Sequence, residues 1–239
     1  MRRGLSLLEL LVVVIILCLL IAIMMPSRAI VHKSARTAIC AANLKAIGRG
    51  TALYAAQFAD ELPPQRGPDA KWLCDLREAD GLRSIVGSAM AGGMRQDSMT
   101  KLFYCPANST QDPVKLWSRP GGCMIGYAWM GPRESLPEIG IERALPKPRV
   151  QFHEKFEKTH AEEAELAFDW IISVDKSTTD YTSVKRGSDT FSTSHLNGAK
   201  PSEENVVCFD GHVESRKWAG ETKAVAVQCD GAAFWVVNP

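Results

Sequence analysis

The chain has 239 residues, of which 46% are hydrophobic and 23% are charged, and this composition is ordinary for a globular protein. Its 28 basic and 27 acidic side chains leave a formal net charge of +1, so no overall basic field marks it as a nucleic-acid-binding protein. The length suffices for one domain, or for a small domain joined to an anchor, on a prior of ~100–200 residues per domain.

The first predicted element is an apolar run over residues 5–25, which follows two arginines and contains Glu9 near its start. Its length matches the ~20 helical residues that cross a bilayer core, so we expect a transmembrane segment over 5–26. The alternative is a cleaved secretory signal, but its apolar core is usually only ~7–15 residues long. A carboxylate in such a run costs ~2.5–3.5 kcal/mol at the helix centre, which favours a functional role for Glu9 over a carboxylate that snorkels to the headgroups.

The helical pattern continues after Pro26. A stripe of residues recurs at alternating spacings of four and three, as one face of a helix requires: Cys40, Leu44, Ile47, Thr51, Tyr54 and Phe58. Proline removes one backbone hydrogen bond, so we expect it to kink the helix rather than end it. The sequence thus predicts one long helix to about residue 60, with 27–60 as its soluble half; the alternative is an anchor followed by an independent helix.

The remaining residues, 61–239, predict a globular head built from short strands. Five apolar segments are typical of such strands: 101–106, 123–130, 165–174, 205–209 and 224–237. The last contains Asp230-Gly231, a hairpin-turn signal. The predicted fold class is α+β, with a long N-terminal transmembrane helix that continues into a head with a small antiparallel sheet.

Six cysteines follow the apolar run: Cys40, Cys74, Cys105, Cys123, Cys208 and Cys229. An even number suits disulfides in an oxidising compartment, which places the head outside the cytoplasm. No Cys-x-x-Cys pair occurs, which argues against a zinc or redox motif. Chain position suggests the pairs Cys40–Cys74, Cys105–Cys123 and Cys208–Cys229, and buried free thiols are the alternative.

The start of the chain closely resembles the cleavage and methylation signal of type IV prepilins and type II secretion pseudopilins. Gly4 lies where prepilin peptidase cleaves in that family, and Leu5 becomes the N-methylated first residue, although phenylalanine is usual there. Glu9 then becomes the fifth mature residue, as in the family, and Pro26 occupies the place of its helix-kinking proline. The resemblance implies staggered packing of helices, in which Glu9 of one subunit approaches the new ammonium group of another.

This resemblance implies a pilus or pseudopilus subunit in the bacterial inner membrane, with a cytoplasmic N-terminus and a periplasmic or extracellular head. Its expected domains are a leader (1–4), a transmembrane segment (5–26), a soluble helix (27–60) and a pilin-like head (61–239). The expected partners are prepilin peptidase, other pilin or pseudopilin subunits and inner-membrane lipid, with no nucleic acid. The alternatives are an anchored extracytoplasmic binding protein that does not polymerise, and an anchored periplasmic enzyme.

The head is similar to a subgroup of prepilin-like proteins that carry a C-terminal His…Asp-Gly element. Residues 40–48 match the run Cys-x-Asn-Asn-Leu-Lys-x-Ile-Gly that follows the anchor, except that Ala42 replaces an asparagine. Residues 103–106, Phe-Tyr-Cys-Pro, are a second match, with Tyr127 downstream. The third is His195 with Asp210-Gly211, although fourteen residues separate them here where the family has nine.

The residues that could carry chemistry cluster in this last region. His195, Asp210 and His212 are of the types used in metal and acid-base sites, and Asp169 and Asp230 are further carboxylates. The favoured interpretation is a tight Asp210-Gly211 turn between strands, with His195 as its hydrogen-bonding partner.

A calcium ion near Asp210 is the other hypothesis, because the heads of some pseudopilins bind calcium at an acidic loop. Asn197, Glu203 and Glu204 would add oxygen ligands of the right type, but their spacing is irregular. The sequence contains neither a Gly-x-Ser-x-Gly nucleophile elbow nor a phosphate-binding loop. We therefore predict no catalytic residues, no enzymatic activity and no cofactor beyond that calcium ion.

Overall fold

The computed structural model describes residues 7–62, 72–76, 100–117, 123–131, 155–156, 158, 161, 164–175, 180–221, 224–229 and 231–237. Gly4, Leu5 and Asp230 therefore lie outside the described residues. Contacts between residues divide the chain into two compact units, 1–36 and 37–239.

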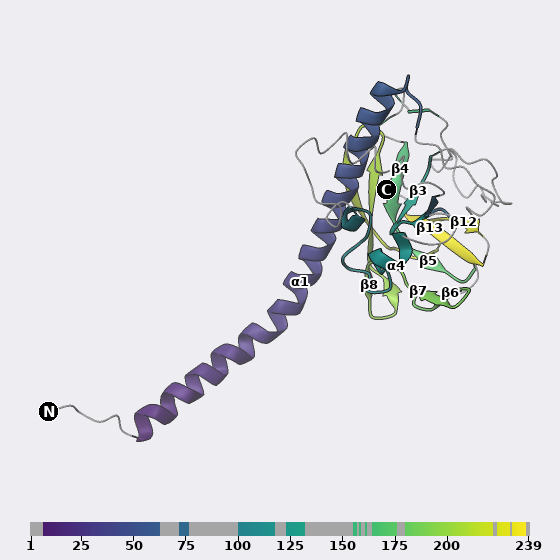
Figure 1. Ribbon diagram of the computed structural model, residues 1–239. Coiled ribbons are helices and arrows are strands. Elements are labelled where there is room, and N and C mark those ends of the chain that lie inside the picture. Colours follow the sequence, from purple (N-terminus) through teal and green to yellow (C-terminus); the bar gives the residue numbers. More distant parts are fainter. Residues whose placement is uncertain are drawn as a thin grey trace. The chain divides into compact units, whose positions relative to one another are not determined.

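Helix α1 spans Leu7–Gln57 and passes Pro26 without ending (Figure 1). Within the residues described, however, no helix combines the length and the apolar character that crossing a membrane requires. The predicted transmembrane segment 5–26 is therefore wrong. The single-pass location in an inner membrane, which followed from that segment, is wrong for the same reason.

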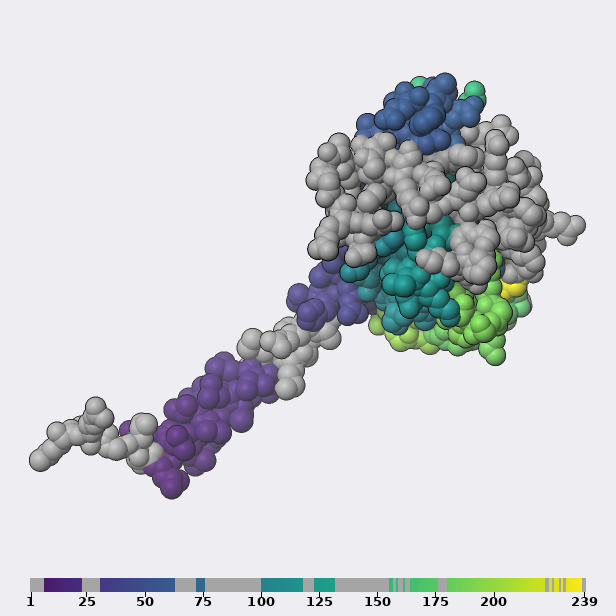
Figure 2. Space-filling model, in the orientation of Figure 1, coloured from purple at the N-terminus to yellow at the C-terminus, as the bar shows by residue number. Residues whose placement is uncertain are grey.

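The first part of α1, residues 7–22 (purple in Figure 2), is apolar and exposed. The exposed fractions of its large apolar side chains run from 46% at Val12 to 84% at Leu7. Glu9, the single charged residue of this stretch, is exposed as well. Apart from Glu9, this part of the helix is therefore apolar on every side.

The part of α1 that belongs to the second unit, residues 37–57, has one buried face. Cys40, Leu44, Ile47 and Thr51 are fully buried, as the predicted stripe requires. The stripe ends earlier than expected, because Phe58 lies just after the helix, is 48% exposed and stacks on Tyr54 at 4.4 Å. The buried face of α1 thus extends over about five turns, from Thr37 to Ala55.

Two sheets form most of the head, and all their strand pairs are antiparallel. The four-stranded sheet has the order β11 (Val213–Lys217), β10 (Glu203–Cys208), β4 (Glu165–Asp169) and β3 (Tyr127–Trp129). The three-stranded sheet has the order β12 (Ala224–Cys229), β13 (Ala232–Val237) and β5 (Ile172–Ser173).

Three two-stranded pairs complete the described strands. They are β1 (Asp75–Leu76) with β2 (Cys123–Met124), β6 (Val184–Arg186) with β7 (Asp189–Phe191), and β8 (Leu196–Asn197) with β9 (Lys200–Pro201). A short helix, α4, spans Pro113–Trp117. With thirteen strands in five sheets among the described residues, the prediction of a transmembrane helix carrying a small sheet is wrong in both parts.

The predicted strands differ from the observed ones in instructive ways. Residues 165–174 form two strands, because the chain leaves the four-stranded sheet at Trp170 and joins the three-stranded sheet at Ile172. The predicted strand 101–106 is wrong: residues 100–104 form a helical turn, in which Phe103 N donates to Thr100 O at 3.1 Å. The hairpin at 224–237 is confirmed, with Cys229 opposite Ala232 across the turn.

Helix α1 lies against the four-stranded sheet along β10 (Figure 1). At the start of β10, Thr37 bonds to Glu203, and near its end a Cβ atom built on Gly48 would lie 2.7 Å from Val207 Cγ2. Residues 37–48 rise about 16 Å as a helix, close to the about 17 Å that a six-residue strand spans. The two elements therefore run side by side in the same direction, and Gly48 permits their close approach.

Candidate functional site: a buried histidine–aspartate cluster beside a disulfide

The candidate site is centred on His195, which lies just before β8 and is only 2% exposed. Its Nε2 atom is 2.8 Å from Oδ2 of Asp169, the last residue of β4, which is fully buried. Two acceptors cannot sit this close, so a proton must lie between the ring nitrogen and the carboxylate. The pair therefore forms a strong hydrogen bond in a site that excludes solvent.

Asn205 of β10 holds the same carboxylate oxygen. Its backbone N donates to Asp169 Oδ2 at 3.1 Å and its Nδ2 at 2.7 Å, because the two residues lie on neighbouring strands. The other oxygen, Asp169 Oδ1, is buried and has no hydrogen-bond partner among the described residues. An unsatisfied buried carboxylate oxygen is costly, so this atom requires an explanation.

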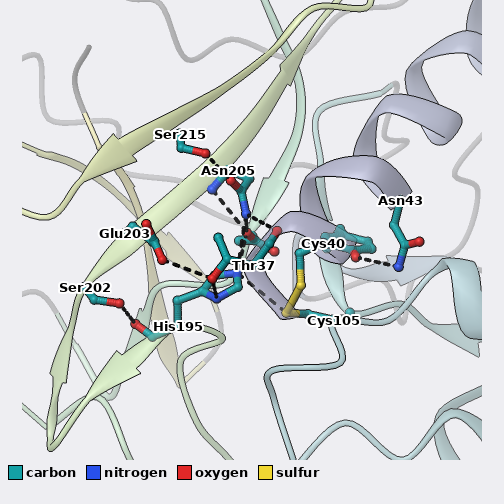
Figure 3. A network of polar contacts seen from close by, with 12 residues as sticks. Thr37, Cys40, Asn43, Cys105, His195, Ser202, Glu203, Asn205 and Ser215 are labelled. Atoms are coloured by element: carbon teal, nitrogen blue, oxygen red, sulfur yellow. Dashed lines mark hydrogen bonds and ion pairs between the residues drawn. A yellow bond between two sulfur atoms is a disulfide. The ribbon is translucent and has the colours of Figure 1, made fainter. Parts of the chain in front are cut away.

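Thr37 of α1 contacts the other ring nitrogen. Its Oγ1 atom donates to Glu203 Oε1 at 3.0 Å and lies 3.4 Å from His195 Nδ1. Ser215 Oγ on β11 donates in turn to Asn205 Oδ1. Figure 3 shows these side chains pointing toward one another from the helix and the strands. The histidine is thus oriented from both sides.

A disulfide lies directly beside this cluster. Cys40 of α1 is bonded to Cys105, 65 residues later in the chain, and both are buried. Cys105 Sγ is 3.6 Å from His195 Nε2 (Figure 3). The predicted pairs Cys40–Cys74 and Cys105–Cys123 are therefore wrong, and so is Cys208–Cys229, because Cys208 is a buried free thiol. The buried stripe of the helix turns Cys40 toward the loop at 103–106, and chain order gave no sign of this.

A pocket of about 470 Å³ opens next to the disulfide and is lined by Cys105 itself, with Ile39, Asn43, Tyr104, Asn108 and Gln111 among its walls. Asn43 Nδ2 donates to Tyr104 O and to Tyr127 Oη, both at 3.3 Å. Burial, and then the nearby charge of Asp169, raise the pKa of Tyr127 well above its usual value, so its phenol stays neutral. The disulfide thus reaches the wall of the pocket through Cys105.

The predicted element of His195, Asp210 and Gly211 is not brought together. Asp210-Gly211 forms the turn after β10, where Gly211 has a φ of +83°, so the predicted turn is confirmed. Its partner is wrong: Asp210 Oδ1 accepts hydrogen bonds from His212 N at 2.9 Å and pairs with His212 Nδ1 at 2.6 Å. His195 instead contacts Asp169, near the opposite end of β10.

The four residues considered for calcium are also apart. Glu203 accepts from Thr37 and Glu204 from the backbone N of Val237, both at the start of β10, whereas Asp210 follows its end. Asn197 lies on β8 and is exposed. Within the described residues, no close group of three or more His, Cys, Asp or Glu side chains includes Asp210. The calcium hypothesis is therefore not supported.

Two other groups have ligand atoms that all lie within 4.8 Å of one another. The first is Cys40, Cys105, Asp169 and His195, all buried, and the second is Cys208, His212 and Glu214 on the β10–β11 hairpin. In the second group, burial raises the pKa of the Cys208 thiol to about 12, which disfavours the thiolate that a metal needs. The first group is the better candidate metal centre.

Sequence reasoning identified His195 but gave it the wrong partner. Asp169 was only one of several carboxylates, and Thr37 and Asn205 were not singled out. One signal was present: Asp169 interrupts the otherwise apolar stretch 166–172, and a charged residue inside a buried strand needs a buried partner.

Comparisons with known proteins found no relative of this chain. No family model, no curated protein and no solved structure matches the chain. The resemblance of residues 4–26 to prepilins, and of the head to their His…Asp-Gly subgroup, therefore stays a prediction from the sequence.

Proposed function

We propose that the protein is a prepilin-like subunit that is processed by prepilin peptidase and assembles with like subunits, through the first part of α1, into a pilus or pseudopilus fibre. The observation that carries the proposal is the exposed apolar surface of residues 7–22. A helix that is apolar on every side is normally buried, and a large exposed apolar surface marks an interaction site.

Other copies of the same helix suit this surface best. Thirteen large apolar side chains between Leu7 and Ile21 are each about half exposed or more, so packing on any side removes apolar area from water. A helical fibre uses all sides of such a helix, because each subunit then contacts neighbours around its whole circumference. A dimer would leave most of the surface exposed.

Glu9 would set the axial register between neighbouring helices. It is the only charged residue between residues 7 and 22, and packing between helices would bring its carboxylate into an apolar setting. Cleavage after Gly4 would create an ammonium group on Leu5, which can offset that charge in a neighbouring subunit staggered along the axis. The proposed processing and the proposed assembly thus depend on each other.

Mass spectrometry of the protein from its native host tests the processing step. We expect a mature chain that begins at Leu5 and carries one N-methyl group. An intact Met1, or cleavage beyond residue 25, would contradict the proposal. A Gly4→Leu variant should keep its leader, while a control Ala219→Leu variant at an exposed position of the head should be processed normally.

Cys18 offers a direct test of assembly, since it is an exposed thiol within the apolar surface. A thiol-specific crosslinker long enough to span the stagger should yield Cys18–Cys18 dimers of assembled protein, which Cys18→Ser removes. Glu9→Ala should reduce the dimer yield strongly, whereas the control Glu214→Ala on β11 should leave it unchanged. Equal crosslinking in Glu9→Ala and the wild type would show that the carboxylate does not set the register.

A binding protein that does not polymerise is the second candidate, and the pocket of about 470 Å³ beside Cys105 favours it. Pockets of this size accommodate small ligands. The crosslinking experiment separates the two functions, because a monomeric binding protein forms Cys18 dimers only in proportion to its concentration.

A further inference from the structure

We propose that Cys40, Cys105, Asp169 and His195 form a transition-metal site, suited above all to Zn²⁺, when the Cys40–Cys105 disulfide is reduced. The site would be switched by the redox state of the two cysteines: a disulfide in the oxidised protein and a Cys₂HisAsp metal centre in the reduced one. This inference is independent of the assembly proposed above.

The positions of the four side chains fit a tetrahedral ion. Ligand bonds of ≈2.0–2.3 Å place the ligand atoms of tetrahedral zinc about 3.3–3.8 Å from one another. Here Cys105 Sγ lies 3.6 Å from His195 Nε2, and that nitrogen lies 2.8 Å from Asp169 Oδ2. All four ligand atoms lie within 4.8 Å of one another, so an ion requires the two sulfurs to separate and the 2.8 Å contact to widen to the tetrahedral spacing.

Two features of the cluster point to a missing cation. Asp169 Oδ1 is fully buried without a hydrogen-bond partner in the described part of the chain, and a cation bound to this carboxylate would offset the cost of its unsatisfied oxygen. In addition, a proton must lie between His195 Nε2 and Asp169 Oδ2, and a metal ion can replace this proton between the same two atoms. A dication would largely balance the charge of two thiolates and one carboxylate.

The surrounding residues would act as an outer shell. Thr37 Oγ1 donates to Glu203, and the same oxygen lies 3.4 Å from His195 Nδ1, where it could accept a hydrogen bond from an Nδ1–H group. That contact would hold the tautomer in which Nε2 binds the metal. Asn205 donates to Asp169 Oδ2 from both its backbone and its side chain, and so fixes the carboxylate.

The chemistry balances with a dithiol reductant. Its two thiols give two electrons and two protons to the disulfide, so the Cys40–Cys105 bond breaks, two thiols form and the reductant becomes a disulfide. Zn²⁺ then displaces both thiol protons and the proton between His195 and Asp169, which releases three protons. Cys105 lines the adjacent pocket, which gives the reductant and the ion a path to the sulfurs.

Cobalt spectroscopy on the full-length protein tests the site, with Co²⁺ as the probe for Zn²⁺. After reduction with a phosphine and removal of metals, we expect one Co²⁺ per chain, with the visible bands of tetrahedral cobalt and a thiolate charge-transfer band. Asp169→Asn and Cys105→Ser should lose this signal. Asn205→Ala should weaken binding about 10- to 100-fold, as outer-shell changes do.

Cys208→Ala is the matched control, because it removes a buried thiol from the second group of ligand atoms and should leave the signal intact. Circular dichroism checks that each variant is folded. If the reduced wild type is unfolded without metal, one equivalent of Zn²⁺ should restore its spectrum.

Three results would overturn the proposal. They are a reduced, folded wild type that binds no stoichiometric cobalt, an oxidised protein that binds cobalt equally well, and loss of the signal in Cys208→Ala. Failure of Zn²⁺ to refold an unfolded reduced chain would count against it in the same way.

Discussion

The protein holds two histidine–aspartate pairs near opposite ends of strand β10. In the first, His195 Nε2 and Asp169 Oδ2 are 2.8 Å apart and both side chains are buried; in the second, His212 Nδ1 and Asp210 Oδ1 are 2.6 Å apart and both are about 40% exposed. The bond lengths are nearly equal. The two pairs differ in their surroundings, because water can replace every contact of the second pair and none of the first.

This difference shows which of the two pairs matters for the stability of the fold. An exposed ion pair contributes little, usually ~0–1 kcal/mol, whereas breaking a buried pair leaves an uncompensated polar group. The sequence element His195…Asp210-Gly211 is divided between the two pairs, because Asp210 belongs to the exposed pair and His195 to the buried one. The pair that resists replacement is assembled from β4, β10, α1 and the residues before β8.

Removing the disulfide beside the buried pair should have the largest effect. The cross-link closes a loop of 65 residues, and the chain-entropy model assigns about 4 kcal/mol to such a loop. We expect Cys40→Ser/Cys105→Ser to lower the free energy of unfolding by about this amount in guanidinium titrations with a chelator present. Reduction should then have no further effect on the double variant, and an equal effect of Cys208→Ser would contradict this assignment.

Matched substitutions test the two pairs directly. Asp169→Asn should lower the free energy of unfolding by about 2–3 kcal/mol, since the change removes a charged hydrogen-bond acceptor from a buried site. Asp210→Asn keeps the turn residue type and should cost less than about 1 kcal/mol. Urea titrations of both variants would check this, and equal losses would show that burial does not distinguish the pairs.

Glu204 extends the comparison to an acid at the buried end of β10. Burial is the main cause that raises its pKa well above the usual value, so the folded protein holds a proton that the unfolded chain releases as pH rises. Stability from this group is therefore complete below about pH 4.5 and is lost above it, by at most about 1.4 kcal/mol per pH unit.

The isosteric change Glu204→Gln should remove that pH dependence. Its Oε1 atom can still accept the hydrogen bond that Val237 N gives to the carboxylate at 2.8 Å. Unfolding free energies of the wild type and the variant, measured from pH 4.5 to 7.5, should diverge in favour of the variant as pH rises. Parallel curves would mean that Glu204 is ionised in the folded state.

A substitution at Gly48 tests the close packing of α1 on β10 near the Asp210-Gly211 turn. A methyl group there would lie 2.7 Å from Val207 Cγ2 and 3.7 Å from Gly211 Cα, so the helix or the strand must shift. We expect Gly48→Ala to cost about 1–2 kcal/mol in thermal unfolding, as overpacking does. Adding Val207→Ala should relieve part of that cost, and strictly additive effects of the two changes would contradict the close approach.

The sequence predicted the parts of this fold that follow from local pattern. The helical spacing of apolar residues predicted the buried stripe from Cys40 to Thr51. Asp-Gly pairs predicted the hairpin at 224–237 and the turn at Asp210-Gly211. The pairing of Cys40 with Cys105 did not appear, because it depends on which loop the buried face of α1 meets. No local pattern carries that information.

The prediction of a transmembrane segment is wrong, and the Asp169 cluster was not predicted, for two different reasons. The apolar run and its resemblance to prepilins predict a membrane span at 5–26, but no helix in the described residues has the properties needed to cross a membrane. The Asp169 cluster forms because β4 and β10 are neighbouring strands, which places Asp169 beside Asn205 although 36 residues separate them. Neighbouring strands in a sheet are a tertiary fact that residue spacing does not reveal.

The position of Cys40 decides how the head responds to a pull on the N-terminal end of the chain. Tension that arrives along α1 reaches Cys40 within one turn of Thr37, where the helix first contacts the strands. The covalent bond to Cys105 then transmits that tension to the loop at 103–106. Residues 41–57 therefore carry little of the load and stay packed on the sheet. Reduction would remove this mechanical stop and let the helix detach from its first contact onward.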